Sequence, residues 1–168
     1  MTNEYKPKDV ITAIKSGDVS SVKMMLDGNE ELLHLLTPLG SWLHIATEQG
    51  QKEVVELLVN LGIDVNVQGG PSNATPLNTA AYEGNADLLQ YFLEKNAVMD
   101  LSEPDRNPLF AAIHAGHKKI VELLLEAGID TKVKYTGETM QDMDATAFAC
   151  EWGRAEIANL IKAHNELG

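Results

Sequence analysis

The chain has 168 residues, 44% of them hydrophobic and 23% charged, which is typical of a soluble globular protein able to bury a core. Its formal net charge of −12 disfavours contact with phosphate backbones and anionic lipid, so we expect no nucleic-acid or membrane partner. No stretch approaches the roughly 18 apolar residues of a membrane span, and the first eight residues lack the apolar core of a signal peptide. A single cysteine, Cys150, permits no internal disulfide. We therefore expect a cytoplasmic protein.

A glycine between two short helical patterns recurs along the chain. Successive glycines lie 33, 34, 32 and 37 residues apart. An alanine precedes each glycine by four residues, where a small side chain lets neighbouring helices pack closely. Apolar residues at positions four, five, seven, eight and nine after the central glycines predict one stripe of a second helix. The marker glycines are Gly17, Gly50, Gly84, Gly116 and Gly153.

The elements follow one another as five helix pairs. The first pair is degenerate, and the polar residues Ser21 and Lys162 interrupt the apolar stripes of the first and last pairs, as expected of the ends of a stack. Hydroxyl or carboxylate side chains at Ser41 and Asp144 predict helix N-caps. An insertion of about four residues lies near residues 132–143. The predicted repeats span about residues 7–36, 37–69, 70–102, 103–133 and 139–165.

Residues 107–130 carry the pattern most completely, with a Pro-Leu-x-x-Ala helix start, a Gly-His turn, an Ile-Val-x-Leu-Leu-Leu second helix and a closing Gly-Ile-Asp. This segment resembles an ankyrin repeat, and the resemblance extends over about residues 7–165. It implies an all-α solenoid of about five helix-turn-helix repeats, with β-hairpin or loop fingers, in a single domain over residues 1–168. Fingers and first helices would line its concave side.

The sequence offers no catalytic, cofactor or metal-binding set. His44 stands where ankyrin repeats have a histidine that bonds backbone between repeats, and His117 lies in the Gly-His turn, so we interpret both as structural. Neither has a companion at metal-ligand spacing. We expect Cys150 to be buried, because it follows the packing residue Ala149. The protein is therefore not expected to be an enzyme.

In ankyrin proteins most partner contacts come from finger tips and from the two first-helix residues before the turn glycine. The resemblance carries this role to seven of the residues listed below, and the finger side adds Trp42, Arg106 and Tyr135. The alternative for each aromatic side chain is that it covers a neighbouring helix. The expected partner-binding residues are Trp42, Glu48, Gln49, Tyr82, Glu83, Arg106, His114, Tyr135, Glu151 and Trp152.

The resemblance implies a non-enzymatic protein-binding module. Five free-standing repeats with an insertion at 133–140 are also similar to small bacterial ankyrin proteins that act as immunity proteins against polymorphic toxins. That likeness implies a monomer, when free, that masks the basic active surface of a toxin such as a nuclease. The alternative is an intracellular scaffold or regulatory adaptor that binds a cellular protein. The acidic charge fits a basic partner in either case.

Overall fold

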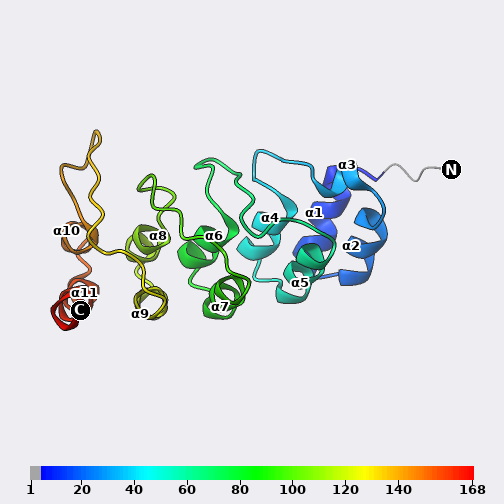
Figure 1. Ribbon diagram of the computed structural model, residues 1–168. Coiled ribbons are helices and arrows are strands. Elements are labelled where there is room, and N and C mark those ends of the chain that lie inside the picture. The colour runs from blue at the N-terminus through cyan, green and yellow to red at the C-terminus, as the bar shows by residue number, and fades with distance from the viewer. Residues whose placement is uncertain (1–4) are drawn as a thin grey trace. The chain divides into compact units, whose positions relative to one another are not determined.

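The structure is a computed structural model that describes residues 5–168 (Figure 1). Within these residues the regular secondary structure is entirely α-helical, and β-type pairing occurs only as isolated bridges. The predicted all-α fold is thereby confirmed. The described residues form two compact units, which divide after Pro76.

Over residues 5–76, the first unit contains five helices. Helix α1 packs against both α2 and α4, α5 packs against both α2 and α4, and the short α3 contacts α2. Figure 1 shows α1 beside α4. The helices are α1 (Pro7–Ser16), α2 (Val19–Leu26), α3 (Glu30–Leu33), α4 (Trp42–Glu48) and α5 (Lys52–Asn60).

Local side chains explain where helices of the first unit begin. Pro7 opens α1 at a position where its missing N–H has no helical partner to lose. The carboxylate of Asp18 accepts a hydrogen bond from the backbone N–H of Ser21 at the start of α2. The side chain of Asn29 caps α3 in the same way by accepting from Leu32 N–H. Helix α3 was absent from the sequence-based prediction, which had no apolar periodicity to detect in four residues.

The second unit repeats one arrangement three times. Helix α8 lies beside α10, and α9 lies beside both α7 and α11. In Figure 1, α6, α8 and α10 form one row and α7, α9 and α11 a second, with the connecting loops extending beyond the first row. The helices are α6 (Pro76–Glu83), α7 (Ala86–Glu94), α8 (Pro108–Ala115), α9 (Lys118–Glu126), α10 (Ala145–Glu151) and α11 (Ala155–Leu167).

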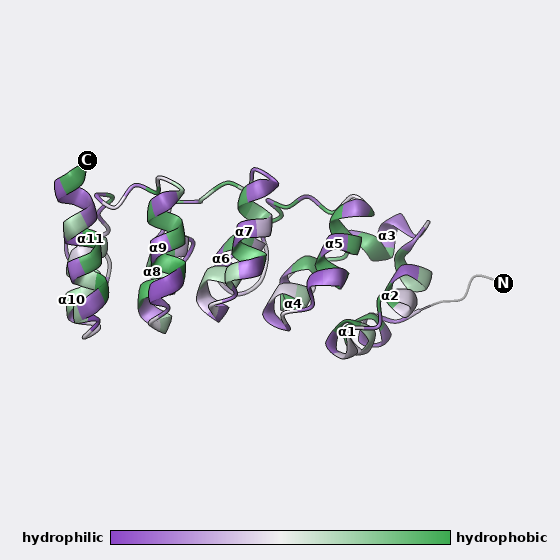
Figure 2. Cartoon of the chain, turned by 90° about the horizontal axis from the view of Figure 1, so that it is seen from below, coloured by the Kyte–Doolittle hydropathy of each residue, from purple (hydrophilic) through white to green (hydrophobic). Residues whose placement is uncertain are grey.

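Apolar stripes hold each helix in place. Figure 2 shows hydrophobic bands beside hydrophilic ones on α7 and α9. In α9 the predicted stripe is buried throughout, whereas Lys118, Lys119 and Glu126 are exposed. Burying this stripe supplies the hydrophobic term that fixes the pairing of second helices. The buried residues of α9 are Ile120, Val121, Leu123, Leu124 and Leu125.

Isolated antiparallel bridges close the loops at residues 37–40, 69–74 and 135–143. In the first unit Thr37 pairs with Gly40, and Gly69 pairs with Ala74. In the second unit Tyr135 pairs with Met143, which closes the insertion into a hairpin. Over residues 5–168, no helix is both long and apolar enough to cross a membrane.

Candidate protein-binding surface

Three aromatic rings from successive first helices meet in the second unit. Tyr82 comes from α6, His114 from α8 and Trp152 from the C-cap of α10. The rings of Tyr82 and His114 stack with centroids 5.9 Å apart and an interplanar angle of 27°. The rings of His114 and Trp152 meet edge to face, with centroids 4.3 Å apart and an angle of 89°. We call Tyr82, His114 and Trp152 the aromatic row.

The aromatic row faces solvent. Tyr82 is 48% exposed and Trp152 is 47% exposed, while His114 between them is partly exposed. Large aromatic side chains bury 150–250 Å² when covered, so half-exposed rings leave substantial apolar area in contact with water. Solvent-exposed aromatic residues on a rigid support are typical anchors of a protein interface.

Buried aromatic rings pack against the core side of Trp152, at one end of the aromatic row. Trp152 contacts Phe148, with ring centroids 5.8 Å apart, and Phe148 stacks on Phe110 at 4.5 Å and 25°. Phe148 is 9% exposed and Phe110 is 3% exposed, so both belong to the core. Trp152 is therefore held between a buried ring and His114, and its orientation does not depend on a partner.

A hydrogen bond also positions the middle of the row. The guanidinium Nη2 of Arg154 donates to the backbone carbonyl of His114 at 2.9 Å. In the first unit, Gln51 Nε2 donates to the carbonyl of Lys15 at 3.3 Å. Arg154 and Gln51 each follow a turn glycine, so the same position fastens adjacent repeats in both units. Sequence reasoning missed this role, although the long polar side chain after the glycine was a signal for it.

Carboxylates flank the exposed rings. Glu83 follows Tyr82 in the chain, Glu151 precedes Trp152, and both are exposed. Glu48 and Gln49 occupy the corresponding positions of α4 in the first unit, where they are exposed as well. The second unit thus combines apolar ring surface with negative charge, a pattern that favours a cationic partner.

Tyr135 is not at the surface, contrary to the expectation that it contacts a partner. It is 9% exposed, and its ring meets Phe110 edge to face at 5.0 Å. Its hydroxyl accepts from Asn107 Nδ2 at 3.0 Å and donates to the carbonyl of Leu101 at 2.8 Å. Burial raises the pKa of the Tyr135 hydroxyl above its ordinary value. Tyr135 therefore anchors the inserted hairpin to the preceding finger. Arg106, which was also expected to contact a partner, is partly exposed.

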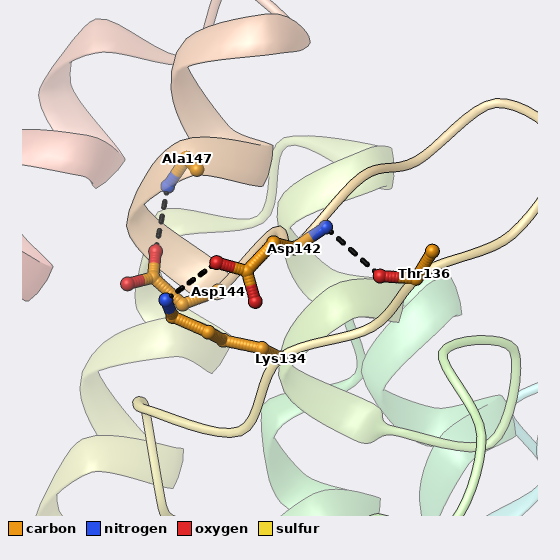
Figure 3. Close-up of polar contacts among 5 residues, drawn as sticks. All are labelled: Lys134, Thr136, Asp142, Asp144 and Ala147. Carbon is orange, nitrogen blue, oxygen red and sulfur yellow. Dashed lines mark hydrogen bonds and ion pairs between the residues drawn. The ribbon is translucent and has the colours of Figure 1, made fainter.

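Polar contacts within the inserted hairpin define its shape (Figure 3). Lys134 Nζ and Asp142 Oδ2 form an ion pair at 2.8 Å, and Asp142 N–H donates to Thr136 Oγ1 at 3.0 Å. The Asp142 carboxylate raises the pKa of the Lys134 amine by accepting a hydrogen bond from it. Asp144 then caps α10 by accepting from Ala147 N–H at 2.9 Å, as predicted. The hairpin is thus ordered by local bonds.

Trp42 is the second expected contact residue that the structure places in the core. It is 0% exposed, and its indole N–H donates to the carbonyl of Leu32 at 2.7 Å. The bond joins α4 to α3, a helix that was not predicted. An indole that is completely buried and hydrogen-bonded presents no surface to a partner, so Trp42 stabilises the first unit.

His44 has the structural role predicted for it. Its Nδ1 accepts from the backbone N–H of Ser41 at 3.2 Å, and its Nε2 lies 2.9 Å from the carbonyl of Ala74. The carbonyl can only accept, so the proton is assigned to Nε2 of a neutral ring. Burial lowers the pKa of His44, outweighing the opposite effect of the bond to Ala74. His44 therefore links the start of α4 at Ser41 to the finger at 69–74.

Cys150 is exposed, which corrects the expectation that it packs in the core. It lies beside the buried Ala149, but the helix turns its side chain away from the interior. Over residues 5–168, no group of three or more histidine, cysteine, aspartate or glutamate side chains is arranged to hold a metal ion.

Comparison with known proteins agrees with this architecture. A family model described as ankyrin repeats (3 copies) matches residues 43–135 and 77–167. Palmitoyltransferase AKR1 of Lachancea kluyveri is 33% identical over 125 residues, which are 72% of this chain but only 17% of that protein.

Two further relatives have regulatory names. Protein phosphatase 1 regulatory subunit 27 of Homo sapiens is 30% identical over 127 residues, covering 74% of this chain and 82% of that protein. Regulatory protein NPR5 of Arabidopsis thaliana is 41% identical over 95 residues, covering 56% of this chain and 18% of that protein. With repeated helix pairs in the structure and a family model matching most of the sequence, the chain belongs to the ankyrin-repeat family.

Proposed function

We propose that this protein is a non-enzymatic regulatory adaptor of the cytoplasm that binds another protein through the aromatic row. The observation that carries the proposal is the half-exposure of Tyr82 and Trp152 on rings that are already fixed by their neighbours. Binding costs less when interface side chains are ordered beforehand. Ankyrin repeats are a module for protein–protein interaction, and two of the relatives are named as regulatory proteins.

An immunity protein is the second candidate, favoured by the net charge of −12. A negatively charged surface is suited to cover the basic substrate groove of a nuclease, because it has the sign of the nucleic acid. The regulatory names of the relatives support the adaptor instead. Co-expression with a neighbouring toxin gene separates the two functions: rescue of growth and a stable complex on size exclusion would favour immunity, and neither is expected of an adaptor.

The adaptor is tested by affinity capture from host lysate, with the partner identified by mass spectrometry and its affinity then measured with purified proteins. Tyr82→Ala and Trp152→Ala should each weaken binding by about 2 kcal/mol, the range of an interface anchor. Circular dichroism should show unchanged helical content, because both side chains are half-exposed. Leu167→Ala is the control, since this residue is 91% exposed and lies outside the row. Unchanged affinity in both aromatic variants would contradict the proposal.

A further inference from the structure

We infer that the aromatic row recognises an extended basic segment of its partner in which two arginines stand two residues apart. This inference rests on the proposed function and specifies which side chains of the partner are recognised. Three observations carry it: the geometry of the rings, the carboxylates beside them and the placement of the nearest cation.

The ring geometry favours two planar cations over one. Tyr82 and Trp152 stand at the two ends of the row, separated by His114 with centroid distances of 5.9 Å and 4.3 Å. In an extended chain, side chains on one face recur about every 7 Å. Two long side chains at positions i and i+2 therefore reach both end rings together. Each end ring is half-exposed and offers surface for a cation–π contact.

The flanking carboxylates select for arginine. Glu151 directly precedes Trp152 in the chain and is exposed, so its carboxylate is available to a guanidinium that stacks on the indole. A planar guanidinium stacks on an aromatic ring and binds a carboxylate through two N–H groups, which the compact ammonium of lysine cannot do. Glu83 adds exposed negative charge at the Tyr82 end.

The nearest cation of the second unit is committed to the backbone. Arg154 is partly buried, and its Nη2 donates to the carbonyl of His114 at 2.9 Å. The Arg154 guanidinium lies against Gly116 and would repel an incoming guanidinium, but the dipole of the His114 carbonyl partly balances its charge. Lys118 pairs with Glu156 at 3.3 Å on the second helices. The charge closest to the exposed rings in sequence is thus that of Glu83 and Glu151.

The experiment is an NMR titration of the full chain with synthetic peptides of glycine and serine around a central Arg-Thr-Arg. Matched peptides carry Lys-Thr-Lys or Gln-Thr-Gln. The indole N–H signals of the two tryptophans report the site, because Trp152 is 47% exposed and Trp42 is 0% exposed. The arginine peptide should shift the Trp152 signal and leave the Trp42 signal in place. It should bind about threefold more tightly than the lysine peptide and about tenfold more tightly than the glutamine peptide.

Variants of the protein provide the second arm. Trp152→Ala and Tyr82→Ala should each lower the affinity for the arginine peptide about tenfold, and Glu151→Gln about threefold with a weaker salt dependence. Here the Tyr82→Ala protein is followed through the Trp152 signal and the Trp152→Ala protein through labelled peptide. Glu126→Gln removes an exposed carboxylate of α9 outside the row, and should bind as the unaltered protein does. A stationary Trp152 signal, or equal affinity for all three peptides, would overturn the inference.

Lysate capture separates failure of this inference from failure of the proposed function. A captured partner that needs Tyr82 and Trp152, together with no preference for the arginine peptide, would refute the inference and leave the adaptor standing. Capture that is indifferent to both rings would refute the proposed contact surface, and with it the inference.

Discussion

The imidazole of His117 fills the space that a side chain on Gly84 would occupy. A Cβ built on Gly84 would lie 2.7 Å from His117 Cε1 and Nδ1, closer than real Cβ contacts. Gly84 also has a φ of +73°, in the left-handed region that other residues adopt at a cost of about 1–2 kcal/mol. The turn glycine of one repeat is therefore covered by the residue that follows the turn glycine of the next.

Gly84→Ala should lower the free energy of unfolding by more than the backbone cost of about 1–2 kcal/mol, because the imidazole must also move. Urea denaturation followed by circular dichroism measures the loss. Gly128→Ala is the matched control: its φ is +80°, but no atom lies within 4 Å of the added Cβ. Equal destabilisation by both substitutions would show that contact with His117 contributes nothing.

Trp42→Phe should destabilise the protein by about 1–3 kcal/mol, because a phenyl ring leaves the buried carbonyl of Leu32 without its 2.7 Å donor. Thermal and urea unfolding measure the effect. Trp152→Phe makes the same chemical change at a ring that is 47% exposed, and should alter stability by less than about 0.5 kcal/mol. Unchanged stability of Trp42→Phe would mean that the hydrogen bond from the indole to Leu32 does not hold α3 against α4.

Tyr135→Phe removes one hydroxyl and should cost about 1–3 kcal/mol of stability. The hydroxyl serves both Asn107 Nδ2 and the carbonyl of Leu101, and Asn107 is 0% exposed, so its amide would lose a bond that water cannot readily replace. Tyr82→Phe provides the control, because that side chain is 48% exposed. Hydrogen exchange should locate the loss at 101–107 and 135–143; an unchanged rate there would contradict the anchoring role.

The stability of the protein should fall as the pH drops below about 6.5, the ordinary pKa of histidine. Burial lowers the pKa of His44 in the folded state, so between that lowered value and 6.5 the unfolded chain binds more protons. The contribution of neutral His44 is complete above this window and is lost as pH falls through the lowered pKa. Protonation would also abolish the acceptor that Nδ1 offers to Ser41 N–H.

Urea denaturation from about pH 8 to pH 5 measures this dependence. His44→Gln should be less stable at neutral pH and should show a smaller decline over the acidic part of the range. His34→Gln is the control, since His34 is exposed and forms a pair at 3.2 Å with Glu30, four residues earlier. Parallel pH profiles of the unaltered protein and His44→Gln would show that another group causes the decline.

Periodicity in the chain was enough to predict the helical repeats and the apolar stripe of α9, because an amphipathic helix of nine residues carries its buried face in its own residue spacing. His44 was assignable from the resemblance of its segment to the ankyrin pattern, which places a histidine there to bond backbone between repeats, and its Nε2 lies 2.9 Å from the carbonyl of Ala74. Helix α3 was not predictable, since four residues contain no period.

The exposure of individual aromatic rings followed from contacts between residues far apart in the sequence. Trp42 and Trp152 are the same residue type near first helices, yet one is buried against the carbonyl of Leu32 and the other lies half-exposed on Phe148. Tyr135 is buried against Phe110, and Asn107, 28 residues earlier, donates to its hydroxyl. Repeat spacing determines which helices form. The burial of each aromatic side chain depends on the residues packed around it, and only the tertiary structure determines those contacts.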